Sequence, residues 1–374
     1  MPRFFSHQQA GGLGPSDCSP AQARRLPMLV LAALLLGPLA ACAPEDGSGV
    51  QSQKMAAIQS RGKLICGVEG TLPGFSFVEP DGRYSGLDVD VCKAVAAALL
   101  GDASKVEYRN LNSSERFAAL ASGEVDLLSR NTTETLSRDA AGGNGLSFAP
   151  TVFYDGQGVM VPVASGIKGL KDLAGKPICV ESGTTTELNL ADRMRELNVA
   201  YTPLKFQTSD QTYAAYLGAR CVAVTSDRSQ LAGKRSSFPN ADAHALLPEV
   251  MSKEPLSPAS VNSDPAWADA LRWSIYALMQ AEEWGLTQAN VDAKLSEAKA
   301  NPNLADLRRF LGVEGDFGKQ LGLPSDFAFK AIKAVGNYGE MFDRNVGPAS
   351  KLKLERGINR QWKEGGLIYA PPFR

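Results

Sequence analysis

A dense group of hydroxyls and arginines lies in the segment LLSRNTTETLSRDA, residues 127–140. It contains two arginines, five serine or threonine residues, one asparagine and one glutamate, and it begins with apolar residues typical of a strand. A guanidinium binds a carboxylate or a phosphate through two parallel hydrogen bonds, and hydroxyls add further donors. The segment therefore predicts an anion-binding site directly after a strand.

Other polar residues also follow predicted strands. They are Asn131, Thr133 and Arg138 after the strand at 126–131; Ser182, Gly183, Thr184, Thr185 and Thr186 after the strand at 177–182; Asp227 at the end of the strand at 221–227; and Glu69 with the loop GTLPGFSF after the strand at 63–69. Ligands bind at the carboxyl ends of strands in open α/β sheets, because loops and helix N-termini converge there. Arginine and hydroxyls for an anion, with aspartate for a cation, match the two charges of an α-amino acid.

Each of these residues also has a structural interpretation. Arg138 is typical of a solvated residue at the start of a helix, and Asp227 is typical of a helix cap. The segment SGTTTE matches a capping box, with threonine followed by glutamate three residues later. The residue types alone leave both interpretations open.

Short apolar runs alternate with helical patterns over residues 63–227. Strands are expected at 63–69, 106–111, 126–131, 156–162, 177–182, 202–207 and 221–227, and helices in DVDVCKAVAAALLG, SERFAALASG, TELNLADRMREL and SDQTYAAYLGA. The alternation predicts an α/β fold with mostly parallel sheets and flanking helices. From Pro265 onward the chain is expected to be helical, with helices that start after Asp264 and near Thr287.

Length and composition indicate an ordinary globular protein. The 374 residues are 44% hydrophobic and 21% charged, which favours two domains. The formal net charge of -1 lacks the basic excess of nucleic-acid-binding proteins, so no nucleic-acid partner is expected. Zinc-ligand spacing, a P-loop and a nucleophile elbow are missing from the sequence, and neither a metal nor a cofactor is expected.

The N-terminus is typical of an export signal. Arg24 and Arg25 precede the apolar run LPMLVLAALLLGPLAAC, which is shorter than the ~20 residues of a membrane span. The end of the run resembles a bacterial lipoprotein box, so residues 1–41 are predicted as the signal and Cys42 as the lipidated residue. The alternatives are simple cleavage after Ala41 or a buried apolar helix. The polar residues 42–54 are predicted as a flexible tether.

Four cysteines remain after the leader and the box: Cys66, Cys92, Cys179 and Cys221. They allow three pairings. Their order along the chain suggests the local bridges Cys66–Cys92 and Cys179–Cys221, and an oxidising compartment favours disulfides over buried free thiols.

Ten ordered blocks from about residue 55 to the C-terminus carry a family resemblance. They are GKLICGVEGTLPGFSF, YSGLDVDVCKAVAAALLGD, ERFAALASGEVDLLSRNTTETLSRD, YDGQGVMV, CVESGTTTELNLAD, SKEPLSPA, WGLTQANVD, LGVEGDFGKQLGL, VGNYGEMFDRNVG and GGLIYAPP. Together they resemble the general L-amino acid substrate-binding proteins of polar amino acid ABC transporters.

The resemblance implies a type II periplasmic-binding-protein fold of two α/β lobes, with a cleft that closes on an L-amino acid. Lobe 1 is expected at 55–160 plus 255–374, including the C-terminal helices, and lobe 2 at 161–254. The implied protein is a periplasmic or surface-held monomer that delivers its ligand to the membrane subunits of a permease.

The resemblance also assigns roles to residues. Arg138 matches the arginine that binds the α-carboxylate, helped by Asn131 and Thr133 on one side and by Thr184 and Thr185 on the other. Asp227 matches the aspartate that binds the α-ammonium. Leu72 and Phe75 fall in the loop that covers the ligand, and Ser113 and Arg116 match residues that reach the ligand side chain in acid-binding relatives.

Glu69 departs from the pattern, since acid-specific relatives carry an arginine there. A carboxylate at this position would repel a glutamate side chain, so the sequence favours a broad range of ligands, and Glu69 fits a salt bridge nearly as well. The alternative function is an enzyme on the same scaffold, a dehydratase or lyase. Acid–base chemistry would need a poised histidine or carboxyl group; Glu69 is the one credible base, and His244 fits a structural role better.

Overall fold

The computed structural model describes residues 52–374. The predicted signal at 1–41, the predicted lipid acceptor Cys42 and most of the tether at 42–54 lie outside the described residues. Ser52 caps the first helix, α1 (Gln53–Arg61), by accepting a hydrogen bond from the Met55 amide. Among the described helices, none has the length and apolar character needed to cross a membrane.

The first of two five-stranded sheets has the order β5-β1-β6-β15-β7. Its strands are β1 (Leu64–Val68), β5 (Val106–Asn110), β6 (Leu127–Leu128), β7 (Leu146–Phe148) and β15 (Ala259–Val261). β1 pairs in parallel with β5 and β6, and β15 runs antiparallel to both of its neighbours. Four strands therefore run in one direction and one runs in the other.

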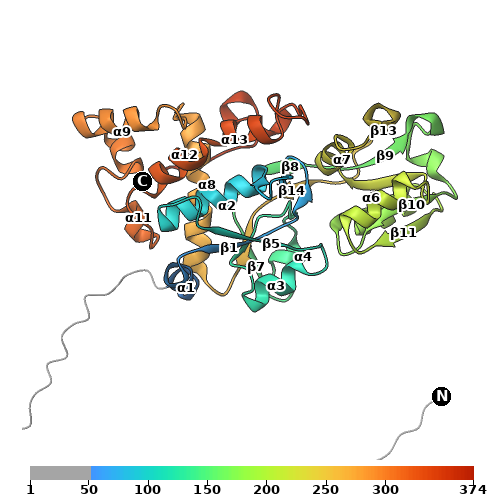
Figure 1. Ribbon diagram of the computed structural model, residues 1–374, viewed down its shortest axis with the longest axis horizontal. Helices are drawn as coiled ribbons and strands as arrows, with labels where there is room; N and C mark the ends of the chain where they lie inside the picture. Colours follow the sequence, from blue (N-terminus) through green and yellow to red (C-terminus); the bar gives the residue numbers. More distant parts are fainter. Residues whose placement is uncertain (1–51) are drawn as a thin grey trace, which may run out of the picture. The chain divides into compact units, whose positions relative to one another are not determined.

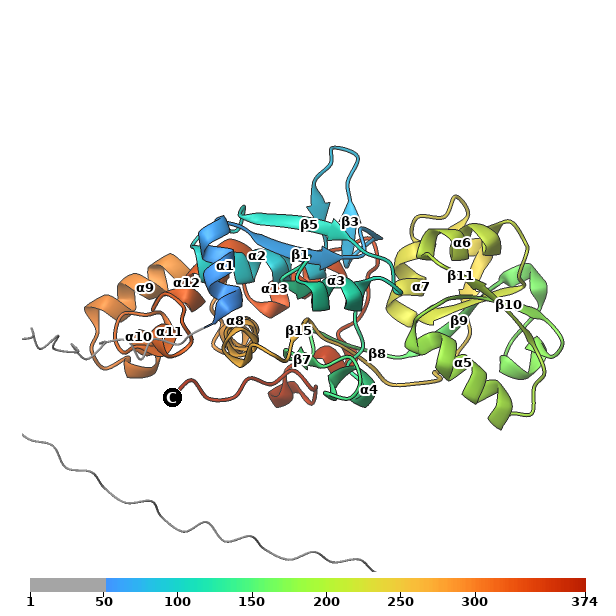
Figure 2. The ribbon, with the colours of Figure 1, turned by 90° about the horizontal axis from the view of Figure 1, so that it is seen from below.

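The second sheet repeats this arrangement with the order β11-β10-β12-β9-β13. Its strands are β9 (Gln157–Pro162), β10 (Pro177–Glu181), β11 (Thr202–Phe206), β12 (Ala223–Asp227) and β13 (His244–Leu246). β9 is the antiparallel member. Figure 2 shows α5 (Thr185–Glu196), α6 (Ser209–Leu217) and α7 (Arg228–Arg235) around these strands. The fold class expected from the sequence is confirmed, and each sheet is mixed.

A short antiparallel pair lies where the chain passes between the sheets. β8 (Phe153–Asp155) comes just before β9 of the second sheet, and β14 (Glu254–Leu256) comes just before β15 of the first. The two strands pair with Glu254 opposite Asp155. A small separate sheet, made of β2 (Thr71–Leu72), β3 (Ser76–Val78) and β4 (Tyr84–Ser85), follows β1. The division into lobes at 160/161 and 254/255 stays a prediction, although β9 already pairs in the second sheet from Gln157.

The C-terminal helices pack on the first sheet's helices. One hydrophobic cluster joins β1 to α2 (Leu87–Leu100), α8 (Pro265–Glu283), α12 (Phe327–Val335) and α13 (Tyr338–Asn345), and Figure 1 shows α2, α8 and α12 side by side. A smaller cluster covers the other face of the sheet against α3 (Arg116–Ser122). The remaining helices are α4 (Leu136–Asp139), α9 (Val291–Ala300), α10 (Ala305–Phe310) and α11 (Phe317–Gln320).

The helix-start signals in the sequence have different outcomes. Asp264 caps α8 by accepting a hydrogen bond from the Trp267 amide, with Pro265 in the first turn, as expected. The helix expected near Thr287 begins at Val291 instead. Thr287 and Asn290 exchange side-chain and backbone hydrogen bonds in a turn, so their capping groups are used before the helix starts.

Both predicted disulfides are present. Cys66–Cys92 joins β1 to α2, and Cys179–Cys221 joins β10 to the segment before β12. Each bridge therefore ties one sheet to its own surroundings rather than to the other sheet.

Candidate functional site

A small buried cavity lies where loops of the two sheets come together. Its volume is about 20 Å³, which is room for about one water molecule. The lining residues lie at or shortly after the ends of β5 and β6 of the first sheet and of β10 and β12 of the second. They are Ser113, Arg116, Arg130, Asn131, Thr133, Glu181, Thr184, Thr185, Thr186, Ser226, Asp227 and Gln230. A molecule larger than water therefore fits this space only if the two sides of the cavity separate.

The first-sheet side of the cavity is held by a buried aspartate. Asp88, in the first turn of α2, accepts hydrogen bonds from the Ser129 hydroxyl at 3.2 Å and from the Asn131 amide at 3.1 Å. Asn131 has a φ of 36°, a left-handed conformation that asparagine tolerates better than most residues. This turn ends β6 after Leu128 and directs Asn131 to the cavity. Burial raises the pKa of Asp88 to about 6.

The second-sheet side is built from two strand ends. Thr184 caps α5 by accepting a hydrogen bond from the Glu187 amide at 3.1 Å, so this part of the capping interpretation is confirmed. Asp227 ends β12 and precedes α7, but its side chain makes no capping hydrogen bond. Its Oδ1 atom is buried and has no partner among the described residues. Asp227 therefore occupies the N-cap position of α7, as the helix-cap interpretation predicts, but its side chain does not cap the helix.

The lining contains both a hydrogen-bond donor and acceptors that have no partner in the described part of the chain. Within residues 52–374 these buried atoms are Arg116 Nε, Asn131 Oδ1, Glu181 Oε1 and Asp227 Oδ1. Glu181 Oε1 lies 3.7 Å from Arg130 Nη2, close enough for ionic attraction but not for a hydrogen bond. Buried polar groups in native proteins almost always have partners, and an exception calls for an explanation. A ligand with both donors and acceptors supplies the missing partners.

Burial shifts the two most important charges in opposite senses. It lowers the pKa of the Arg116 guanidinium, with Arg130 and Arg138 acting in the same direction. It raises the pKa of Asp227 well above its usual range, and the carboxylates of Asp155 and Glu254 raise it further. Both shifts disfavour the charged forms, so both groups gain from a ligand charge of opposite sign.

Arg138 lies beside the cavity and not among its lining residues. Its side chain is 6% exposed, its Nη1 donates to the Thr133 carbonyl at 2.7 Å, and its guanidinium lies 5.2 Å from the centre of the Phe117 ring. Burial lowers the pKa of Arg138 to about 10. The interpretation of Arg138 as a solvated residue is therefore wrong, and its guanidinium is held in place next to Thr133.

Three other predicted contacts are not in the cavity lining. Leu72 and Phe75 are fully buried in the first core, where Phe75 packs edge-on against Phe153. The Glu69 carboxylate accepts hydrogen bonds from the Thr71 amide at 2.6 Å and the Thr71 hydroxyl at 2.7 Å. Glu69 thus orders the start of β2 in this structure.

The family of the chain follows from sequence comparison. Residues 64–309 match the model of the bacterial extracellular solute-binding proteins, family 3. The protein belongs to this family. Membership places it outside the cytoplasm and agrees with a cavity formed between two α/β sheets.

Two relatives and one solved structure extend the match. The general L-amino acid-binding periplasmic protein AapJ of Rhizobium johnstonii is 48% identical over 87% of this chain and 94% of its own. The glutamate/glutamine/aspartate/asparagine-binding protein BztA of Rhodobacter capsulatus is 46% identical over 92% of this chain and 97% of its own. A periplasmic binding protein from Brucella ovis with glutathione bound is 47% identical, with a TM-score of 0.82 over 87% of this chain and 100% of its own.

Sequence reasoning named eight lining residues of this protein and missed four: Arg130, Glu181, Ser226 and Gln230. Arg130 lies two residues after the end of β6, and Glu181 is the last residue of β10. The strand-end argument that selected Asp227 applies equally to both, so a stricter use of it would have found them.

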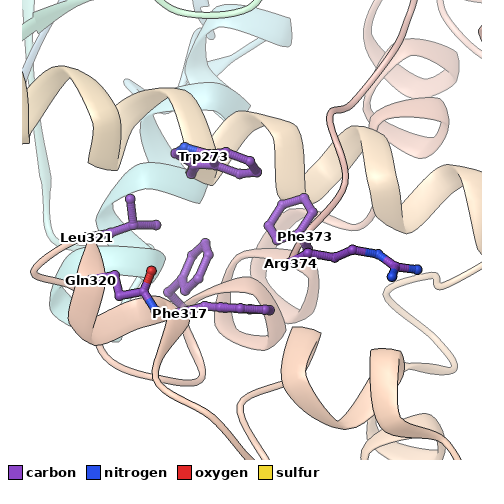
Figure 3. A pocket seen from close by; sticks show the side chains of 7 residues that line it. Trp273, Phe317, Gln320, Leu321, Phe373 and Arg374 are labelled. Atoms are coloured by element: carbon purple, nitrogen blue, oxygen red, sulfur yellow. The ribbon is translucent and has the colours of Figure 1, made fainter.

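A second cavity of this family 3 protein has different chemistry. It has a volume of about 130 Å³ and lies beside α8, α11 and α12. Figure 3 shows Trp273, Phe317, Leu321 and Phe373 facing it, with Gln320 and Arg374 at its border. Its lining includes no aspartate or glutamate side chain for an ammonium. The polar cavity between the sheets therefore fits a zwitterion better.

Proposed function

We propose that the protein is the extracytoplasmic substrate-binding subunit of an amino-acid ABC transporter. It binds L-amino acids between the two sheets and delivers them, as a monomer, to the membrane subunits of a permease. The carrying observation is the cavity in which an unpartnered atom of Arg116, from α3 beside the first sheet, and one of Asp227, from β12 of the second sheet, both lie in the lining. The names of AapJ and BztA support amino acids as the ligand class.

The ligand is placed by its charges. Asp227 binds the α-ammonium, and Arg138 binds the α-carboxylate with donors from the Asn131 and Thr184 loops. Arg116 and Ser113 lie where the ligand side chain extends, close to Glu181 and Gln230 in the same lining. Because cationic, anionic and amide groups border this space together, it suits acidic and amide side chains and tolerates other polar ones.

The predicted lipid at Cys42 completes the proposal. A lipid on Cys42 and the tether at 42–54 hold the binding domain at a membrane surface. Mass spectrometry of the purified exported protein tests this point, because lipidation adds acyl mass to an N-terminal Cys42, whereas simple cleavage leaves it unmodified.

The enzyme alternative has less support. His244 lies in β13, where its Nδ1 is 2.7 Å from the Tyr216 hydroxyl, and it does not line the cavity. Glu69 is also not in the lining. The relatives are named as binding proteins. A small peptide with a γ-glutamyl end is a second candidate ligand, because the Brucella ovis structure holds glutathione and that end carries a free α-amino acid group.

Thermal melting against the twenty L-amino acids, D-glutamate, glutathione and glutarate tests the proposed function. A ligand present at 100 times its Kd adds about 2.7 kcal/mol to the free energy of unfolding, which raises Tm by a few degrees in a protein of this size. We expect shifts with several L-amino acids and a much smaller shift with glutarate, which lacks an ammonium. The absence of a shift with every L-amino acid would contradict the proposal.

The affinity for amino acids is expected to fall as the pH is lowered. Burial raises the pKa of Asp227, and Asp155 and Glu254 raise it further, so Asp227 takes up a proton at a higher pH than an ordinary aspartate. An ammonium binds only the ionised form. Below this raised pKa, the affinity should fall by about tenfold per pH unit. Calorimetry at several pH values, in buffers of different ionisation enthalpy, measures both the affinity and the proton released. Affinity that increases toward acidic pH would contradict this role of Asp227.

Replacement of Glu69 by glutamine is expected to leave the ligand preference unchanged. Glutamine keeps an acceptor for the Thr71 amide. The charge of Glu69 does not line the cavity, so it acts on the ligand only through screened electrostatics. Kd values for L-glutamate and L-glutamine should each change by no more than about threefold. If Glu69→Gln instead bound L-glutamate at least tenfold more tightly, with L-glutamine unchanged, the result would contradict this prediction and support the repulsion by Glu69 that was inferred from the sequence.

A further inference from the structure

Glu254 of β14 connects the two sides of the cavity. Its Oε2 atom accepts hydrogen bonds from the Thr133 hydroxyl at 2.6 Å and from the Thr185 hydroxyl at 2.9 Å. Its Oε1 atom accepts from Asn189 Nδ2 at 2.8 Å and from the Ser252 hydroxyl at 2.5 Å. Thr133 follows β6 of the first sheet, and Thr185 begins α5 of the second. Glu254 is 1% exposed, and four donors surround its carboxylate.

These contacts determine what the two threonines offer a ligand. An ionised carboxylate only accepts hydrogen bonds, so both hydroxyls must donate to it. A hydroxyl has one proton and two lone pairs. Once the proton of each threonine points to Glu254, the oxygen presents lone pairs alone to the cavity that both residues line.

We propose that Glu254 is a positioning residue that makes Thr133 and Thr185 hydrogen-bond acceptors and so sets the polarity of the ligand site. Acceptor oxygens attract an ammonium and repel a carboxylate. The inference rests on the proposed function. It moves the two hydroxyls from the carboxylate side, where the sequence resemblance placed them, to the ammonium side with Asp227.

The role of Glu254 differs from that of a structural residue that merely joins the two sides. Loss of a purely structural contact weakens every ligand by a similar factor. Loss of hydroxyl polarity instead weakens ligands that carry an ammonium and spares those that do not. The ratio of the Kd for glutarate to the Kd for L-glutamate separates the two cases, because the ligands differ by the ammonium group.

The test measures this ratio by calorimetry in the wild-type protein and in Glu254→Leu, Glu254→Gln and Ser252→Ala. In Glu254→Leu the hydroxyls are free to donate, and the ratio should fall by about tenfold or more. Glu254→Gln keeps an oxygen toward the threonines, and its amide NH2 donates to the Ser252 hydroxyl and to Asn189 once the Asn189 amide turns its oxygen toward it. This variant should keep the wild-type ratio. Ser252→Ala is the matched control, since Ser252 donates to the other carboxylate oxygen, and its ratio should equal that of the wild type.

Thr185→Val tests the same claim if Glu254→Leu does not fold. If the Thr185 hydroxyl is an acceptor for the ammonium, it stabilises bound glutamate but not bound glutarate. Removal of this hydroxyl should therefore lower the ratio. An unchanged ratio in Glu254→Leu or Thr185→Val, with glutamate still bound by the wild type, would overturn the role of Glu254 and leave the proposed function standing. A wild-type protein that binds no amino acid would overturn both.

Discussion

Replacement of Asp227 by asparagine is expected to weaken the binding of L-amino acids by about 2–5 kcal/mol, or roughly 30- to 5,000-fold in Kd. The substitution keeps the shape of the side chain and removes the charge that faces the ligand ammonium. The loss is large because Asp227 is buried and its Oδ1 atom has no other partner among the described residues. Calorimetric titration with L-glutamate and L-glutamine measures it.

The same substitution is expected to stabilise the unliganded protein. The pKa of Asp227 is raised by burial and by Asp155 and Glu254, so its ionised form lowers the stability of the fold at neutral pH. Asparagine removes this repulsion, and Tm without ligand should rise while the ligand-induced shift disappears. Asp155→Asn is the matched control. Asp155 is a neighbouring buried carboxylate, but it does not line the cavity. An Asp227→Asn protein that binds within about threefold of the wild type would contradict the assignment.

Removal of either disulfide is expected to lower the free energy of unfolding by about 3–4 kcal/mol. The bridges close loops with sequence separations of 26 and 42 residues, which would otherwise gain conformational freedom in the unfolded chain. The Cys66→Ala/Cys92→Ala and Cys179→Ala/Cys221→Ala proteins, unfolded in urea, measure the two effects separately.

The location of the bridges makes the comparison informative. Each bridge lies within one sheet and its helices. If the two sheets unfold in separate transitions, each double variant should lower the urea midpoint of one transition and leave the other unchanged. As a control, a thiol reagent is used to titrate Cys66, Cys92, Cys179 and Cys221 in the denatured, unreduced wild type, where none of the four should react. Unchanged stability in both variants, or four free thiols in the oxidised protein, would contradict the disulfides.

Local patterns predicted about half of the described strands, seven of fifteen. β1 and β10 are short apolar runs between turns, and α8 combines an aspartate cap, an early proline and a long apolar face. The disulfides followed from cysteine order, because each pair lies within one α/β segment. Asp227 was found because strand ends and a family resemblance both selected it, and Arg116 was found through the resemblance alone.

The remaining features depend on contacts between distant residues. Glu254 was read as part of a family block and not as a site residue, because its partners Thr133 and Thr185 are 121 and 69 residues away. Leu72 and Phe75 were expected to cover the ligand, but their apolar side chains are fully buried in the first core. Glu69 was weighed by its charge, whereas the nearby Thr71 provides its hydrogen bonds.

The structure of the complex with L-glutamate tests the central claim most directly. The proposal predicts the ligand between the two sheets, with its ammonium within hydrogen-bonding distance of Asp227, its α-carboxylate against Arg138 and its side chain toward Arg116. Glutamate bound instead in the aromatic cavity beside α8, or placed with its α-carboxylate at Asp227, would contradict it.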